Sequence, residues 1–165
     1  MSNTNLHDLL KNSKLTLCCV ESCTGGYFSE QITSISGASQ YFLGGVVAYN
    51  NHIKETILGI SKQRIEEFGV ISGEIASDLA VRGAQVFHAD ICVSFTGNAG
   101  PGVLENKPVG LIYVAVYFRN RVYTNKLELS GDRNMNRKSA VRFAANIVVR
   151  ILQKSITKSE NLPIY

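Results

Sequence analysis

The sequence lacks several features that mark specialised classes of protein. No apolar run reaches the roughly 18 residues of a transmembrane helix. The N-terminus, MSNTNLHDLLKNSK, has no long apolar region of the kind found in signal peptides. We therefore expect a soluble cytoplasmic protein without membrane contact. Tryptophan is also absent, so only tyrosine and phenylalanine can report on folding.

Signatures of metal sites and disulfides are missing as well. The four cysteines form no C-x-x-C pair, and no cysteine or histidine cluster has zinc-finger spacing. Cys18, Cys19 and Cys92 lie in apolar runs, where a thiol behaves as a small hydrophobe. This pattern is typical of a reducing compartment. We expect neither a metal site nor a cofactor.

The charge balance is mildly basic, with a formal net charge of +4 and a pI of about 8.9. Such a balance suits an anionic ligand or weak contact with nucleic acid. The basic residues are scattered, however, and the densest stretch, 133–142, resembles the start of an amphipathic helix. Because aromatic residues do not alternate with basic ones, the sequence favours a small anion over nucleic acid.

What is present indicates one folded domain. The chain has 165 residues, of which 45% are hydrophobic and 18% charged. We expect a single domain over 1–165, with a core at about 5–153 and a polar tail at 154–165 that frays. Apolar runs predict strands at 15–20, 41–49, 91–95, 109–118 and 121–129, the last two forming a hairpin. Periodicity predicts helices at 4–12, 27–35, 50–58, 61–68, 72–86 and 133–153. This alternation predicts an α/β fold, a three-layer α/β/α sandwich on a mixed sheet.

A polar turn, ESCTGG at 21–26, lies between the first predicted strand and the next helix. Ligands of open α/β sheets bind at the carboxyl ends of strands, and a helix N-terminus there offers free N–H groups. Ser22 can therefore be a nucleophile whose oxyanion the neighbouring N–H groups stabilise. The alternative, which the local sequence alone favours, is that Ser22 or Thr24 simply caps the helix. No Gly-Lys-Ser/Thr follows, so this is not a Walker motif.

Tyr49 and Lys54 follow the second predicted strand. A nucleophilic serine needs a base, and no histidine is suitably placed in these motifs. Lys54 can act as the base if burial or a nearby cation lowers its pKa, and Tyr49 can relay the proton or hold the lysine. The competing interpretation is that Lys54 is solvated, as most lysines are. Gly44-Gly45 within the strand indicates close approach of a ligand or of another backbone.

Two further segments have the composition of an anion site. The glycine-dense loop at 96–102 follows the third predicted strand, and its backbone can aim N–H groups at a phosphate. It does not fit the dinucleotide pattern G-x-G-x-x-G. Arg133 and Arg137 open the last helix, where arginine can clamp phosphate. A cap at Asp132 with solvent-exposed arginines explains this segment equally well from local sequence.

Together these segments resemble the CinA C-terminal domain family over residues 5–153. The matching motifs, in family order and nearly at family spacing, are ESCTGG at 21–26, YFLGGVVAYNNHIK at 41–54, TGNAGPG at 96–102, KPVG at 107–110 and GDR at 131–133. The resemblance implies a five-stranded mixed sheet and a nicotinamide-nucleotide amidase, which converts nicotinamide mononucleotide and water to nicotinate mononucleotide and ammonia. It also implies self-association into a homo-oligomer and no metal in the amidase step.

The resemblance further implies roles for individual residues. Ser22 corresponds to the nucleophile, Lys54 to its base and Tyr49 to the proton relay. The pyridine nucleotide is expected to contact the turn, the second strand, the glycine-dense loop and the last helix. The expected substrate-binding residues are Thr24, Gly25, Gly26, Gly44, Gly45, Thr96, Gly97, Asn98, Ala99, Gly100, Arg133 and Arg137.

The loop at 96–110 departs from the family pattern. It is one residue shorter than the family's TGIAGPGGGTPEKPVG-like string, and Asn98 stands where isoleucine is usual. This leaves open an amidase for a different nucleotide or amide, or a nucleotide-binding or regulatory module without turnover. A role in DNA uptake or repair is suggested only by the family's name. The second domain of fused members is missing, so we expect no pyrophosphatase activity from it.

Overall fold

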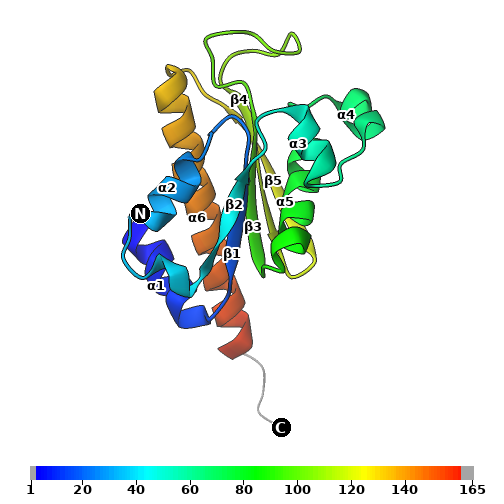
Figure 1. The fold of residues 1–165 in the computed structure, drawn as a ribbon. Coiled ribbons are helices and arrows are strands. Elements are labelled where there is room, and N and C mark those ends of the chain that lie inside the picture. Colours follow the sequence, from blue (N-terminus) through cyan, green and yellow to red (C-terminus); the bar gives the residue numbers. More distant parts are fainter. Residues whose placement is uncertain (1–2, 161–165) are drawn as a thin grey trace.

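The computed structural model describes residues 3–160 (Figure 1). The protein consists of a five-stranded mixed sheet between two helical layers. The strand order is β2-β1-β3-β4-β5. β1, β2 and β3 run parallel, whereas β4 and β5 form an antiparallel hairpin. This architecture confirms the predicted fold class. The strands are β1 (Leu17–Glu21), β2 (Phe42–Val47), β3 (Ile91–Gly97), β4 (Leu111–Phe118) and β5 (Arg121–Glu128).

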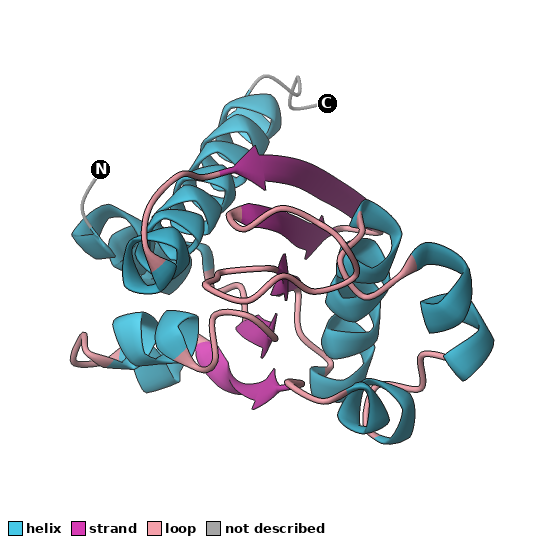
Figure 2. Ribbon diagram, turned by 90° about the horizontal axis from the view of Figure 1, so that it is seen from above, coloured by secondary structure: helices cyan, strands magenta, loops and turns pink. Residues whose placement is uncertain are grey.

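The helices cover both faces of the sheet (Figure 2). One layer contains α1 (Asn3–Ser13), α2 (Tyr27–Thr33) and α6 (Arg133–Glu160). The other contains α3 (Asn51–Thr56), α4 (Lys62–Phe68) and α5 (Gly73–Phe87). A short 3-10 helix, η1 (Ala38–Gln40), leads into β2. No helix among residues 3–160 has the length and hydropathy needed to cross a bilayer.

The central strands β1 and β3 are buried along almost their whole length because helices cover both faces of the sheet. In β1, Leu17 and Cys19 join the core beneath α1, α2 and α6. Cys18 and Val20, which alternate with them, join the core beneath α5. A two-residue period thus supplies both layers from one strand.

Several predicted boundaries differ from the observed ones, and the largest difference is at the C-terminus. The tail was expected to fray from Lys154, but α6 continues to Glu160, and residues 161–165 of the tail lie outside the described residues. The segment 154–160 is polar but contains no glycine or proline, so nothing in it breaks a helix. β4 begins at Leu111 rather than at residue 109, because Gly110 has a φ of 87° and turns the chain.

The parallel strands deliver three motifs to one edge of the sheet. The carboxyl ends of β1, β2 and β3 lead into the turn at 21–26, the segment at 48–54 and the loop at 98–110, respectively. α6 also begins at this edge, which is uppermost in Figure 1. The topology therefore gathers segments that are distant in sequence.

A candidate active site at the carboxyl edge of the sheet

A buried carboxylate shapes the turn after β1. Glu21 is fully buried, and its Oε2 accepts hydrogen bonds from the amides of Gly26 (3.1 Å) and Phe28 (3.0 Å). Its Oε1 accepts bonds from the amide and the hydroxyl of Ser29, both at 2.8 Å. Four donors thus compensate the cost of burying the charge. The expectation that Ser22 or Thr24 caps α2 was wrong, since Glu21 occupies the free amides of its first turn.

Ser22 is therefore not committed to capping. Its amide donates to the carbonyl of Phe95 on β3 (3.0 Å), which fixes the backbone at the end of β1. Its carbonyl accepts from the amide of Gly25 (3.1 Å). The amides of Gly25 and Gly26 consequently bond within the turn. Both glycines have positive φ, 57° and 91°, which favours glycine at these two positions.

Thr24 has unused polar groups. It is fully buried, and among the described residues its Oγ1 is the only buried side-chain N or O atom without a hydrogen-bond partner. Within the same part of the chain, its amide also makes no hydrogen bond. Its carbonyl accepts two bonds from the Arg137 guanidinium, at 2.6 and 3.0 Å. Buried polar groups are normally paired, so the unpaired atoms of Thr24 suit a ligand.

Lys54 on α3 is buried, with only 1% of its surface exposed. The interpretation of Lys54 as a solvated residue was therefore wrong. Its Nζ donates to the side-chain oxygen of Asn51 at 3.4 Å, and it forms no ion pair within the described part of the chain. Burial lowers the pKa of its amine, whereas the nearby Cys23 and Glu105 act in the opposite direction.

Cys23 follows Ser22 directly and interacts electrostatically with Lys54. It is also buried. Burial raises the pKa of the Cys23 thiol to about 12, although Arg133 and Arg137 partly oppose this rise. The thiol is therefore protonated at neutral pH, and a protonated thiol is a poor nucleophile.

Arg133 links three parts of the site. Its guanidinium donates to the carbonyl of Gly100 (2.7 Å) and to the hydroxyl of Tyr49 (3.0 Å), whose side chain is 60% exposed. Asp132 caps α6 by accepting from the amide of Met135 (2.8 Å). The predicted cap at Asp132 is thus confirmed, and Arg133 is exposed whereas Arg137 is half-buried. Neither Arg133 nor Arg137 has a carboxylate partner among residues 3–160.

The loop after β3 uses its polar side chains to hold its own shape. Asn98 donates to the carbonyl of Lys107 (3.1 Å) and accepts from the amide of Gly100 (3.2 Å). The Thr96 hydroxyl donates to the carbonyl of Val70. The carbonyl of Ala99 accepts from Asn136 (3.2 Å). Of the side chains that we expected at a phosphate, Asn98 thus bonds within the loop and Thr96 bonds to the segment before α5.

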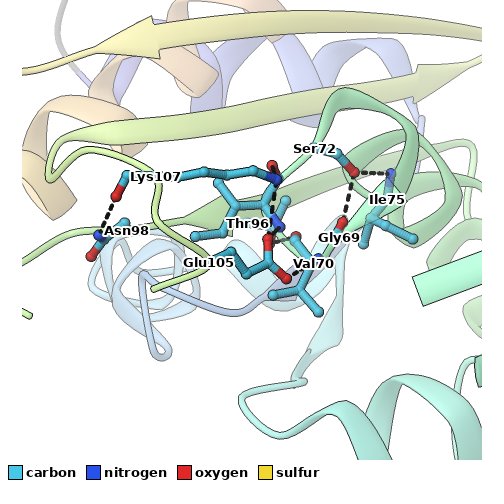
Figure 3. Close-up of polar contacts among 9 residues, drawn as sticks. Gly69, Val70, Ser72, Ile75, Thr96, Asn98, Glu105 and Lys107 are labelled. Carbon is cyan, nitrogen blue, oxygen red and sulfur yellow. Dashed lines mark hydrogen bonds and ion pairs between the residues drawn. The ribbon is translucent and has the colours of Figure 1, made fainter. Parts of the chain in front are cut away.

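An acidic and a basic side chain fasten this loop to the start of α5; we call Glu105 and Lys107 the clasp (Figure 3). The Glu105 carboxylate accepts from the amides of Val70 (2.7 Å) and Ile71 (3.2 Å). Lys107 Nζ donates to the carbonyl of Ile71 (2.6 Å) and pairs with Glu105 (3.1 Å). Sequence reasoning missed the clasp. The local sequence signal for the clasp was Asn106, because asparagine favours turns. In the structure, Glu105 and Asn106 both have positive φ.

Three of the glycines predicted to approach a ligand are packed closely against neighbouring elements. A Cβ on Gly44 would lie 3.2 Å from the Phe87 ring of α5. A Cβ on Gly45 would overlap Cys19 Sγ and lie 2.9 Å from Ser29 Oγ. A Cβ on Gly97 would lie 2.6 Å from the backbone of Ile112 on β4. At Gly44 and Gly45 the nearest atoms belong to side chains of the protein.

No group of three or more His, Cys, Asp or Glu side chains comes together within the described residues in a way that could hold a metal ion. The site is therefore built from a serine turn, a buried lysine, a tyrosine and two arginines. Such groups can perform nucleophilic acyl transfer on an anionic substrate.

Comparison with known proteins gives a consistent result. The model of the CinA C-terminal domain matches residues 2–152. A competence-damage inducible protein of Thermoanaerobacter pseudethanolicus is 47% identical over 87% of this chain and 35% of its own length. A competence-damage inducible protein of Bacillus subtilis is 35% identical over 87% of this chain and 35% of its own length. The chain thus spans about a third of the length of these relatives.

Solved structures share the fold. The competence/damage inducible protein CihA of Agrobacterium tumefaciens superposes with a TM-score of 0.84 at 30% identity, covering 92% of both chains. A CinA superfamily protein of Klebsiella pneumoniae has a TM-score of 0.89 at 24% identity, covering 92% of this chain and 95% of that one. On the family match and these identities, the chain belongs to the CinA C-terminal domain family.

Proposed function

We propose that this chain is an amidase that hydrolyses the carboxamide of nicotinamide mononucleotide to nicotinate mononucleotide and ammonia. The observation that carries the proposal is the burial of Lys54 without a carboxylate partner among the described residues, at the sheet edge that also holds Ser22. A lysine with a lowered pKa can be neutral, and only a neutral amine can accept a proton. The family resemblance of the surrounding motifs supports the choice of substrate.

In the proposed reaction, the Ser22 hydroxyl attacks the carboxamide carbon and passes its proton to the neutral amine of Lys54. The tetrahedral intermediate collapses as that proton reaches the leaving nitrogen, and ammonia departs. Water then attacks the acyl-enzyme with Lys54 again as the base, releasing the carboxylate. Tyr49, whose hydroxyl accepts a bond from Arg133, relays protons at the open side of the site.

Thr24 is the best candidate for stabilising the oxyanion. The neighbouring amides of Gly25 and Gly26 bond to Ser22 and Glu21. The amide and the hydroxyl of Thr24 remain unpaired within the described residues. Donors that are fixed before the reaction stabilise developing charge most effectively.

The choice of Ser22 over Cys23 as nucleophile rests on burial. The Cys23 thiol has a pKa of about 12 and is almost entirely covered, whereas Ser22 is only half-buried. The two guanidinium groups supply positive charge for the substrate phosphate. Arg133 and Arg137 hydrogen-bond to carbonyl and phenol oxygens, so their charges stay uncompensated by the carboxylates of the described chain.

The direct test is ammonia release from nicotinamide mononucleotide by the purified chain. We expect turnover that is lost in both Ser22→Ala and Lys54→Ala and retained in Lys62→Ala, a control at an exposed lysine. Nicotinamide riboside, which lacks the phosphate, should react more slowly through a higher KM. Turnover that survives Ser22→Ala would exclude the assigned nucleophile. Binding of the nucleotide without any ammonia release would indicate a binding module instead.

A further inference from the structure

A groove lies far from the candidate active site, between β5 and the C-terminal half of α6. Its volume is about 930 Å³. We call it the basic groove because, among the side chains that the structure describes, four cationic ones and no acidic one line it: Arg119, Arg121, Arg150 and Lys154. In Figure 2, β5 is the outermost strand, at the top of the view. The nucleotide chemistry proposed above makes no use of this groove.

The groove exists because the two helical layers cover β5 unequally. α5 packs closely along β5, whereas α6 packs on β4 and α1. Thr124 bonds to Ser77 of α5 (2.7 Å), and Val122 packs against the α5 layer. Side chains alternate along a strand, so Arg121 and Tyr123 point to the other face. α6 does not cover the whole of this face of β5, so part of the face stays open.

The floor of the groove is apolar, and its charges are unpaired. Ile147 and Ile151 of α6 also line the groove, and Tyr123 is 38% exposed. Among the side chains that the structure describes, none of the four cations forms a salt bridge. Unpaired charges of one sign around an apolar floor complement a ligand that combines carboxylates with aliphatic groups.

The strand itself offers backbone hydrogen bonds. β5 is the last strand of the sheet, and a two-residue turn joins it to β4, pairing Phe118 with Arg121. In such a hairpin the residues next to the turn bond to each other, so alternate residues turn their N–H and C=O groups outward. In β5 these residues are Val122, Thr124 and Lys126. An extended peptide can add to this edge as a sixth strand.

We propose that the basic groove is a docking site for an extended acidic segment of another protein. The segment pairs with the outer edge of β5, places carboxylates against Arg121 and Arg150, and rests aliphatic side chains on Ile147 and Ile151. The open strand edge favours a peptide, because single-stranded nucleic acid binds through base stacking and phosphate contacts and makes no use of backbone hydrogen bonds at a sheet edge. A second copy of β5 fits less well, because Glu128 is the one carboxylate that this strand offers to the cations of the groove.

The probe for this site is a fluorescein-labelled peptide of sequence ETVTETVTE, added to the full chain at near-physiological ionic strength. Fluorescence anisotropy should show saturable binding that weakens by about tenfold or more in the double variant Arg121→Glu/Arg150→Glu. The matched control, Arg82→Glu on the exposed face of α5, should bind as wild type does. Thermal unfolding of both variants confirms that they are folded.

Hydrogen exchange distinguishes strand addition from loose electrostatic contact. On peptide binding, the amides of Val122 and Thr124 should become protected, whereas that of His52 on α3 should not change. The proposal is overturned if the peptide does not bind, if the double variant binds as wild type does, or if these two amides stay unprotected. It is also overturned if oligo(dT) displaces the peptide and binds more tightly, or if sedimentation shows copies of the chain associating through Arg121 and Arg150. Ammonia release is independent of every one of these results.

Discussion

Lys54 illustrates how the chemistry of a single residue depends on its surroundings. The same side chain on an exposed helix would be an ordinary ammonium group. Here α3 directs it into the protein, where burial lowers its pKa and where Cys23, close by, is uncharged. Glu105 of the clasp is the nearby group that bears negative charge, and it limits how far the pKa of Lys54 falls. A distant loop residue thus influences the proposed base.

The pH dependence of turnover should report this arrangement. If neutral Lys54 is the base, kcat/KM falls as pH drops below its lowered pKa, because the amine becomes protonated. Glu105→Gln removes the charge that raises this pKa, so the acidic limb of the profile should move to lower pH. Glu74→Gln, at an exposed acid on α5, is the control and should leave the limb in place. An unchanged limb in Glu105→Gln would refute the electrostatic link.

At the scale of the elements, glycines in β2 allow the layers to approach the sheet. Gly44 accommodates Phe87 of α5, and Gly45 accommodates Cys19 and Ser29. Ser29 in turn donates to Glu21, which orders the turn that presents Ser22. The packing between α2 and the sheet therefore bears directly on the geometry of the site.

We expect Gly45→Ala to lower the free energy of unfolding by about 1–3 kcal/mol, because the added methyl group overlaps Cys19 Sγ and crowds Ser29. Gly102→Ala is the matched control, since no atom lies within 4 Å of a Cβ there, and its effect should stay within about 0.5 kcal/mol. Urea unfolding measures both. Equal stabilities of the two variants would show that Gly45 is not tightly packed.

Across the whole molecule, the candidate active site and the basic groove lie at separate places on one sheet. The carboxyl edge gathers the serine turn, Lys54 and the two arginines, whereas the basic groove lies beside the outermost strand. Four free cysteines are distributed over both core layers, and all of them are buried. Folding therefore shields all four thiols from reagents in the solvent.

Thiol reactivity should consequently follow global unfolding. We expect the four thiols to react with DTNB slowly in the native protein and together when guanidinium unfolds it, with the same midpoint as the loss of circular dichroism. Iodoacetamide at neutral pH should leave amidase turnover intact, because the Cys23 thiol is buried and its pKa is about 12. Rapid alkylation with loss of activity would make Cys23 a candidate nucleophile.

Several elements of the fold follow from local sequence. The apolar run that contains Leu17 and Val20 predicts a strand buried on both faces, and the structure places one there. Ser61 and Ser72 begin α4 and α5 as their positions predict, each accepting a bond from an amide three residues later. The end of α6 was missed because a polar segment without glycine or proline resembles a tail as much as a helix.

The motifs of the site follow from the sequence, but their internal contacts do not. The strand-turn-helix pattern indicates that Ser22 lies at a strand end, and the same reasoning brings the loop at 98–110 near it. That Glu21 caps α2, that Asn98 braces its own loop and that Glu105 reaches the start of α5 depend on packing across many intervening residues. Residue types alone cannot specify such contacts.

The sequence by itself determined the alternation of strands and helices and the motifs by which the family is identified, because hydrophobic periodicity and turn residues act over short stretches of chain. Only the tertiary structure decided that Lys54 is buried, that Glu21 replaces a serine cap and that β5 leaves a basic groove open beside α6. Burial and charge compensation depend on which segments, distant in sequence, come into contact. The packing of the two helical layers on the sheet determines those contacts.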